Sequence, residues 1–239
     1  MKLASLLSIL VLFGCVATDV CTVPNKPQQV EVLLNIQGVD SVAVENDGVG
    51  RHMEIVNREG ELSHLSFVIK DKMYFKLFSG IGIGDVTQFW NDICVTYGKT
   101  KIRDLNIYIN SPGGDAFSGL AFADEIERAQ RLGFKVTAYS SGIIASAAVP
   151  VFAVCDVRIA APGTIFMVHE AALWKWPGRE TASQIRSQNE LMELLRSRYL
   201  GVLIDNSFLS LSEWRLLEEK TTWFTAEKAK EWGLVDKIE

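Results

Sequence analysis

Three short stretches of this sequence combine small residues with side chains that could attack a carbonyl group. Gly113 and Gly114 end the first stretch, Ser146 lies in the second and His169 in the third. A serine hydroxyl becomes a nucleophile at neutral pH only when a neighbouring base takes its proton. Small residues beside the serine let backbone N–H groups approach a developing oxyanion. These residue types therefore indicate one candidate site for nucleophilic chemistry, provided that the fold brings them together.

Strands must position these residues, because each stretch follows an apolar run. The runs are Leu105–Ile109, Phe134–Tyr139 and Thr164–Val168, and each predicts a buried strand. In open parallel sheets, ligands and reacting groups gather outside the carboxyl ends of the strands. We therefore expect the glycines, the serine and the histidine to meet at one edge of a sheet.

Helical patterns separate these strands. Apolar spacing predicts helices near Val86–Tyr97, 118–132 and Thr181–Ile204, and a further helix that begins at Ala147 with Pro150 in its first turn. Alternating strands and helices favour an α/β fold with a mostly parallel sheet and flanking helices. Gly80, Gly82 and Gly84 lack the spacing of a nucleotide-binding loop, so this run predicts a backbone turn.

The composition narrows the functional class. The chain has 239 residues, 48% of them hydrophobic and 22% charged, which is typical of a globular protein. A net charge of -5 disfavours nucleic acid as a partner, and no apolar run is long enough to cross a bilayer. We expect no cofactor and no metal, since His52 and His64 show no ligand spacing. Cys94 and Cys155 lie in apolar runs and predict buried thiols, with a disulfide between them left open.

The amino-terminal part has a different pattern from the rest. Residues 1–15 have the charge, apolar run and small residue of a secretory signal, and Leu12-Phe13-Gly14-Cys15 resembles a bacterial lipobox that would be acylated at Cys15. Residues 16–29 predict a linker, and residues 30–69 predict a small β-rich extension before the main body at 70–239. We therefore expect an exported protein of the periplasm or envelope, with a lipid tether at Cys15.

Several motifs together resemble the proteolytic subunit of the Clp protease. They are Tyr108-Ile109-Asn110-Ser111-Pro112-Gly113-Gly114, Gly142-x-x-Ala145-Ser146, Met167-Val168-His169 and the tail from Phe224 to Asp236. The resemblance covers roughly residues 74–238 and implies a fold of the Clp/crotonase type with serine peptidase chemistry. It also implies a homo-oligomeric ring, joined to a second ring through the helix after Thr181.

The resemblance assigns a role to each candidate residue. Ser146 becomes the nucleophile and His169 the general base, while the amides of Gly113 and Ala147 form the oxyanion hole. Residues 113–115, which are Gly113, Gly114 and Asp115, line the groove that pairs with an extended substrate. The implied substrate is a peptide or an unfolded protein.

The sequence departs from the family at two points. The acid that orients the histidine aligns with Thr221, so Glu170, Glu218 or Glu219 would have to replace it, or the site would work as a Ser–His pair. The segment that docks the ATPase partner is replaced by the signal and the extension, which predicts ATP-independent cleavage.

Three alternatives remain open at this stage. A catalytically weak or inactive scaffold would keep the fold, and the absence of an acid at Thr221 favours it. A Ser–Lys protease like signal peptide peptidase A would need a lysine, and Lys175 is the nearest one after His169. An acyl-thioester enzyme of the crotonase type would share the fold, but the serine and histidine positions disfavour it.

Overall fold

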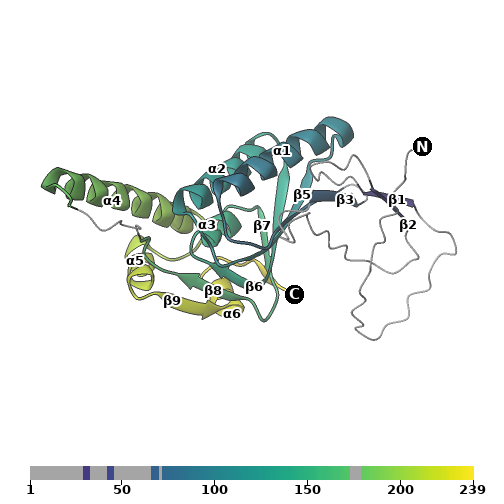
Figure 1. Cartoon of the computed structure of the whole chain (residues 1–239). Coiled ribbons are helices and arrows are strands. Elements are labelled where there is room, and N and C mark those ends of the chain that lie inside the picture. The colour runs from purple at the N-terminus through teal and green to yellow at the C-terminus, as the bar shows by residue number, and fades with distance from the viewer. Residues whose placement is uncertain (1–28, 33–41, 46–65, 70–71, 173–178) are drawn as a thin grey trace, which may run out of the picture.

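The computed structural model describes residues 29–32, 42–45, 66–69, 72–172 and 179–239. Several of the predictions lie outside the described residues. They concern the signal, the lipidation site at Cys15, most of the extension, His52, His64 and Lys175. Within these ranges the chain forms one large sheet with helices around it and a separate two-stranded pair (Figure 1). That pair joins β1 (Gln29–Val32) to β2 (Val42–Glu45) in antiparallel fashion.

The large sheet is mostly parallel, as the sequence predicts. Its order is β10-β7-β6-β5-β4-β3, with β8 and β9 branching from β6. The strands are β3 (Ser66–Ile69), β4 (Lys72–Leu77), β5 (Asp104–Ser111), β6 (Lys135–Ala145), β7 (Val157–Ala160), β8 (Ile165–Val168), β9 (Thr222–Thr225) and β10 (Lys237–Ile238). Only the β3–β4 and β8–β9 pairs are antiparallel in this sheet.

Strand β6 is longer than the sequence pattern predicts, and its extra length positions the site. The strand runs on through residues 140–145, which the sequence interpretation assigned to a loop. Its first half pairs with β7 and its second half with β8, both in parallel. Ile109 of β5 lies opposite Ser140 and Ser111 lies opposite Ile144, so a step of two positions in β5 matches a step of four in β6, and β6 bulges here. The carboxyl end of β6 therefore reaches the end of β8.

Five of the helices pack on strands of the sheet, and their apolar residues recur at helical spacing, whereas α4 (Ala182–Asp205) packs on other helices. The five are α1 (Ile83–Thr100), α2 (Ala116–Arg131), α3 (Ala148–Ala153), α5 (Leu211–Glu219) and α6 (Ala226–Glu231). Phe75 of β4, Phe89 of α1 and Phe122 of α2 are each 1% exposed or less, and their rings pack edge-on or tilted within 6.0 Å. This aromatic cluster fixes α1 and α2 on one face of the sheet.

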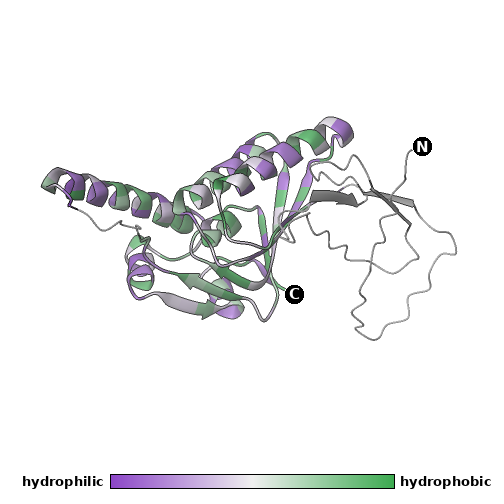
Figure 2. Ribbon diagram, viewed as in Figure 1, coloured by the Kyte–Doolittle hydropathy of each residue, from purple (hydrophilic) through white to green (hydrophobic). Residues whose placement is uncertain are grey.

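Helix α4 packs on the body only through its carboxyl-terminal half. Leu195, Leu200 and Val202 are buried, whereas Ile185 and Leu194 are exposed. Figure 1 shows the amino-terminal half as an arm projecting from the body, and Figure 2 shows hydrophilic and hydrophobic residues mixed along it. The helix thus contacts its own core at one end, while the role of the arm stays a prediction.

Two cysteine expectations have separate outcomes. Cys155 is buried and Cys94 is exposed, and both are free thiols. The prediction of burial is therefore wrong for Cys94, which lies on the outward face of α1, and the two thiols do not form a disulfide. Burial raises the pKa of the Cys155 thiol well above its usual range, so this group is unreactive.

Candidate functional site

Ser146 lies in a tight turn between β6 and α3. Its φ is 53°, a left-handed conformation that is uncommon for a residue other than glycine. The Ser146 N–H donates to Met167 O at 2.8 Å, and the Val149 N–H donates to Ser146 O at 3.0 Å. Backbone strain of this kind persists only where the surrounding contacts hold it, and it is frequent at functional sites. The turn is therefore fixed on both sides and presents the partly exposed hydroxyl at the end of the strand.

His169 follows directly after β8, and its ring reaches Ser146. Because β8 runs parallel to β6, with Met167 opposite Ala145, the residues that follow both strands leave the sheet side by side. His169 Nε2 lies 2.8 Å from Ser146 Oγ. That distance lets the imidazole accept the hydroxyl proton, which is the geometry a serine nucleophile requires.

Gly113 is packed directly against this turn. Its φ is 92°, and a Cβ atom added there would lie 2.6 Å from Ala145 O, 2.7 Å from Ser146 Cβ and 2.9 Å from Ala147 N. Only glycine fits such a position. The backbones of Gly113 and Ala147 thus lie close together beside the turn that carries Ser146. In this structure the Gly113 N–H donates to Ser111 Oγ at 3.2 Å, which is within the normal range for a hydrogen bond.

The turn that contains Gly80, Gly82 and Gly84, here called the first glycine-rich turn, holds the backbone around Gly114. Ile81 N–H donates to Gly113 O at 2.8 Å, and Asp115 N–H donates to Ile81 O at 2.9 Å. The Asp115 carboxylate caps α2 by accepting from the Ser118 N–H at 2.7 Å. Gly114 lies opposite Ile81 in a parallel bridge, and the two hydrogen bonds of this bridge use Gly113 O and Asp115 N–H. The N–H and C=O groups of Gly114 itself therefore point away from Ile81.

Asn110 and Ser111 support this arrangement, although sequence reasoning gave neither of them a role. Asn110 Oδ1 accepts from the Ile143 N–H at 3.0 Å and so ties β5 to the bulge of β6. The Ser111 hydroxyl donates to Ser79 O at 2.6 Å, which holds the first glycine-rich turn. Both residues belong to the motif before Gly113. Their position, polar side chains at the end of a predicted strand, was the signal in the sequence that could have indicated a supporting role.

Thr221 does not replace the missing acid, and no described carboxylate bonds to His169. Thr221 is exposed, has a φ of 50° and uses its N–H to donate to Glu218 O at 3.0 Å. The three alternative acids all contact Arg196 of α4. Its nitrogens lie 2.7 Å from Glu218, 2.8 Å from Glu219 and 3.6 Å from Glu170. Within the described residues, Ser146 is the only hydrogen-bond partner of His169.

Burial raises the pKa of two side chains that contact this part of the fold, Glu218 and Tyr199. The pKa of Glu218 is raised, first by burial and then by Glu170 and Glu219, while Arg196 acts to lower it. Burial, with Glu218 nearby, also raises the pKa of Tyr199. The Tyr199 hydroxyl therefore stays protonated and donates to Ser146 O at 3.3 Å. Nothing in the sequence pattern pointed to this contact across 53 positions.

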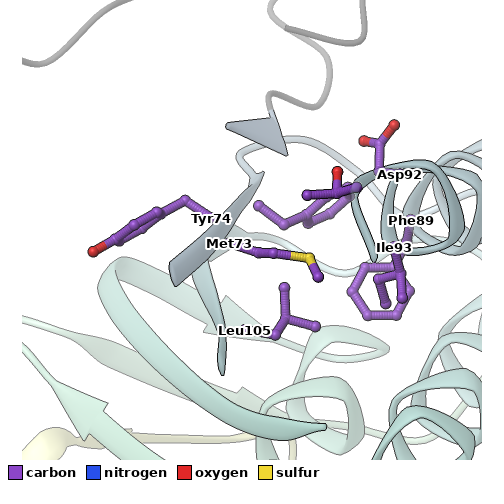
Figure 3. Close-up of a pocket in the computed structure, with 8 residues that line it drawn as sticks. Met73, Tyr74, Phe89, Asp92, Ile93 and Leu105 are labelled. Atoms are coloured by element: carbon purple, nitrogen blue, oxygen red, sulfur yellow. The ribbon is translucent and has the colours of Figure 1, made fainter. Parts of the chain in front are cut away.

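The described part of the chain shows neither a metal site nor a membrane span. It contains no group of side chains that could hold a metal ion, and none of its helices is both long and apolar enough to cross a membrane. A small pocket lies between α1 and the amino ends of β4 and β5, lined by Met73, Tyr74, Phe89, Asp92, Ile93 and Leu105 among others (Figure 3). Ser146 follows the carboxyl end of β6, so this pocket lies at the opposite end of the parallel strands.

The mostly parallel sheet with flanking helices is consistent with the Clp/crotonase fold. Residues 77–239, more than half of the chain, match the family described as Clp protease. The chain belongs to this family.

Individual relatives are more distant. The chain is 28% identical over 138 residues to an ATP-dependent Clp protease proteolytic subunit of Bacteroides fragilis, covering 57% of this chain and 64% of that protein. A protein with the same description from Bacteroides thetaiotaomicron is 29% identical over 138 residues, covering 57% of this chain and 60% of that protein. The matches thus span less than two thirds of the length of these relatives.

The close packing of α2 on the nucleophile turn gives a stability prediction. A Cβ atom on Gly119 of α2 would lie 2.7 Å from Ala147 O and 2.8 Å from Ala147 Cβ. We expect Gly119→Ala to lower the free energy of unfolding by about 1–3 kcal/mol, because overpacking outweighs the helix preference of alanine. Urea unfolding followed by circular dichroism measures the change.

Gly201 in α4 is the matched control. A Cβ atom there would meet nothing within 4 Å, so Gly201→Ala should raise the free energy of unfolding by about 0.5–1 kcal/mol. An equal gain for both variants would show that α2 does not press on the Ala147 turn.

Proposed function

We propose that this chain is a serine endopeptidase of the Clp proteolytic-subunit type, which cleaves peptides or unfolded protein without ATP. The observation that carries the proposal is the 2.8 Å distance between Ser146 Oγ and His169 Nε2. Membership of the Clp protease family and the packing of Gly113 against the same turn support it.

The proposed chemistry follows from these positions. His169 takes the proton of Ser146 as the hydroxyl attacks the peptide carbonyl, and the Gly113 and Ala147 amides stabilise the oxyanion. His169 then gives the proton to the leaving amine, and a water molecule hydrolyses the acyl-enzyme with the same base. An extended substrate adds as a strand along the exposed N–H and C=O groups of Gly114, which favours peptides and unfolded segments over folded proteins.

The site would work as a Ser–His pair with slow turnover. In a triad protease, removing the function of the orienting acid lowers turnover by about 10⁴. A reaction with an activated probe depends less on that acid than complete peptide turnover does, because an activated leaving group needs no proton from the histidine. We therefore expect acylation of Ser146 to be easier to detect than peptide hydrolysis.

Location and assembly belong to the same proposal. The signal-like residues 1–15 and the lipobox at Cys15 favour an exported protein tethered to the envelope. The projecting half of α4, with Ile185 and Leu191 exposed, suits docking of a second copy in a homo-oligomeric ring assembly. A mature mass that starts at Cys15 and carries acyl chains would support the tether, and any other start would remove it.

A catalytically inactive scaffold is the second candidate. Its support is that, within the described residues, no carboxylate bonds to His169. The Ser–Lys alternative has less support, because the Ser146 hydroxyl is hydrogen-bonded to His169.

Labelling with a fluorophosphonate probe tests the proposed function. We expect the wild-type chain to be labelled at Ser146, and we expect Ser146→Ala to abolish labelling with an unchanged circular dichroism spectrum. Equal labelling of both proteins, or no labelling of either, would favour the scaffold.

A further inference from the structure

We propose that Arg196 is a positioning residue for His169 and acts through Glu170. The inference rests on the proposed function, since it concerns how the base of that site is held. No described carboxylate is hydrogen-bonded to the His169 ring. The next residue, Glu170, forms an ion pair with Arg196. The Glu170 carboxylate lies 3.6 Å from an Arg196 nitrogen, so this ion pair restrains the backbone that carries the imidazole.

The guanidinium is well placed to act as an anchor. Arg196 Nε lies 2.7 Å from Glu218, whose side chain is only 3% exposed, and the Arg196 side chain itself is 18% exposed. Glu219 contacts another nitrogen at 2.8 Å, but its side chain is 52% exposed, so the guanidinium is held mainly by the buried Glu218. Charge-assisted bonds to a buried partner leave the guanidinium little freedom. Arg196 is therefore rigid, whereas the Glu170 side chain is 55% exposed and depends on it for order.

The same helix also contacts the nucleophile. Tyr199 follows Arg196 by three positions, so the two side chains lie on one face of α4. The Tyr199 hydroxyl donates to Ser146 O at 3.3 Å. One face of α4 thus touches the backbone of Ser146 and the residue beside His169. This shared support would preserve the 2.8 Å contact between them without an acid on the imidazole.

Glu170→Gln is the cleanest test, because it removes the tie to His169 and leaves the buried pair of Arg196 and Glu218 intact. Glu219→Gln is the matched control. Glu219 is 52% exposed, contacts the same guanidinium and lies far from His169 in the chain. An exposed ion pair contributes about 0.2–1 kcal/mol, which corresponds to at most about a five-fold change in rate. We expect Glu170→Gln to slow fluorophosphonate labelling of Ser146 two- to five-fold at unchanged thermal stability, and Glu219→Gln to label at the wild-type rate.

A spectroscopic measurement separates this inference from the proposed function. The chain has 3 histidines, so His169 can be assigned in long-range ¹H–¹⁵N spectra of the imidazoles by comparison with His169→Asn. We expect Glu170→Gln to shift or broaden the His169 ring signals, and Glu219→Gln to leave them in place. Wild-type spectra and labelling for Glu170→Gln would overturn the positioning role alone. Absence of labelling in every variant, with the His169 shift still present, would overturn only the peptidase.

Discussion

Gly113→Ala should reduce the rate of fluorophosphonate labelling at Ser146 by at least about 100-fold, which is the size of effect expected when an oxyanion donor is lost. The added Cβ would lie 2.6 Å from Ala145 O and 2.7 Å from Ser146 Cβ, far inside van der Waals contact. A φ of 92° would also be strained for alanine. The turn must therefore move, and both the hydroxyl and the Gly113 amide lose their positions. Single-turnover labelling at several probe concentrations measures the change.

Gly80→Ala is the control for this prediction. Gly80 lies in the neighbouring turn, and a Cβ atom there would meet only Gly113 O at 3.6 Å, an ordinary contact. This variant should label within about two-fold of the wild type, because an ordinary contact requires no rearrangement. Labelling of Gly113→Ala within ten-fold of the wild type would contradict the placement of this glycine against the nucleophile.

The order of the strands and helices could be predicted because it depends on local sequence patterns, namely apolar periodicity and helix caps. Such patterns include the capping box of Ser210 and Glu213 at the start of α5 and the Thr225 cap of α6. Pro150 falls in the first turn of α3, where a missing N–H costs little. The apolar runs that end near Gly113, Ser146 and His169 are parallel strands, so the expectation that their ends meet is confirmed by the fold.

The supports of the site could not be predicted, because they depend on contacts between distant segments. The bulge of β6 is held by Asn110, 33 positions before Ile143. Ile81 pairs with the loop at Gly113, a contact that depends on the pairing of β4 with β5. Neither interaction has a periodic signature, and the small residues Ser140, Ser141 and Gly142 indicate a loop by their type, although they continue β6 in the fold.

The three glutamates illustrate the same limit for electrostatics. Each was a reasonable substitute for the missing acid when judged by its distance in sequence from His169 or Thr221. Their common partner, Arg196, is separated from Glu218 by 22 positions and from Glu219 by 23. Whether a carboxylate is available to an imidazole depends on which cation already holds it. For Glu218 and Glu219, the packing of α4 on α5 determines that this cation is Arg196.

Arg196→Ala should destabilise the fold by about 3 kcal/mol at pH 8, because it leaves Glu218 buried without its cation. Burial already raises the pKa of Glu218, and Arg196 is the group that lowers it, so the pKa rises further in the variant. A carboxyl group whose pKa is higher in the folded than in the unfolded chain binds an extra proton on folding. Stability is then lost as the pH rises through the folded-state pKa, with a limiting slope of about 1.4 kcal/mol per pH unit.

Urea unfolding at pH 5 and pH 8 distinguishes this charge effect from a simple loss of packing. The variant should lose less stability, relative to the wild type, at pH 5 than at pH 8. Arg196→Met combined with Glu218→Met should recover most of the loss and remove its pH dependence, since neither charge then remains buried. Arg131→Ala is the control, because its side chain is 67% exposed and only pairs with Glu127 at 3.7 Å. An equal loss at both pH values would mean that Glu218 is solvated, and that Arg196 has no fixed anchor from which to hold Glu170.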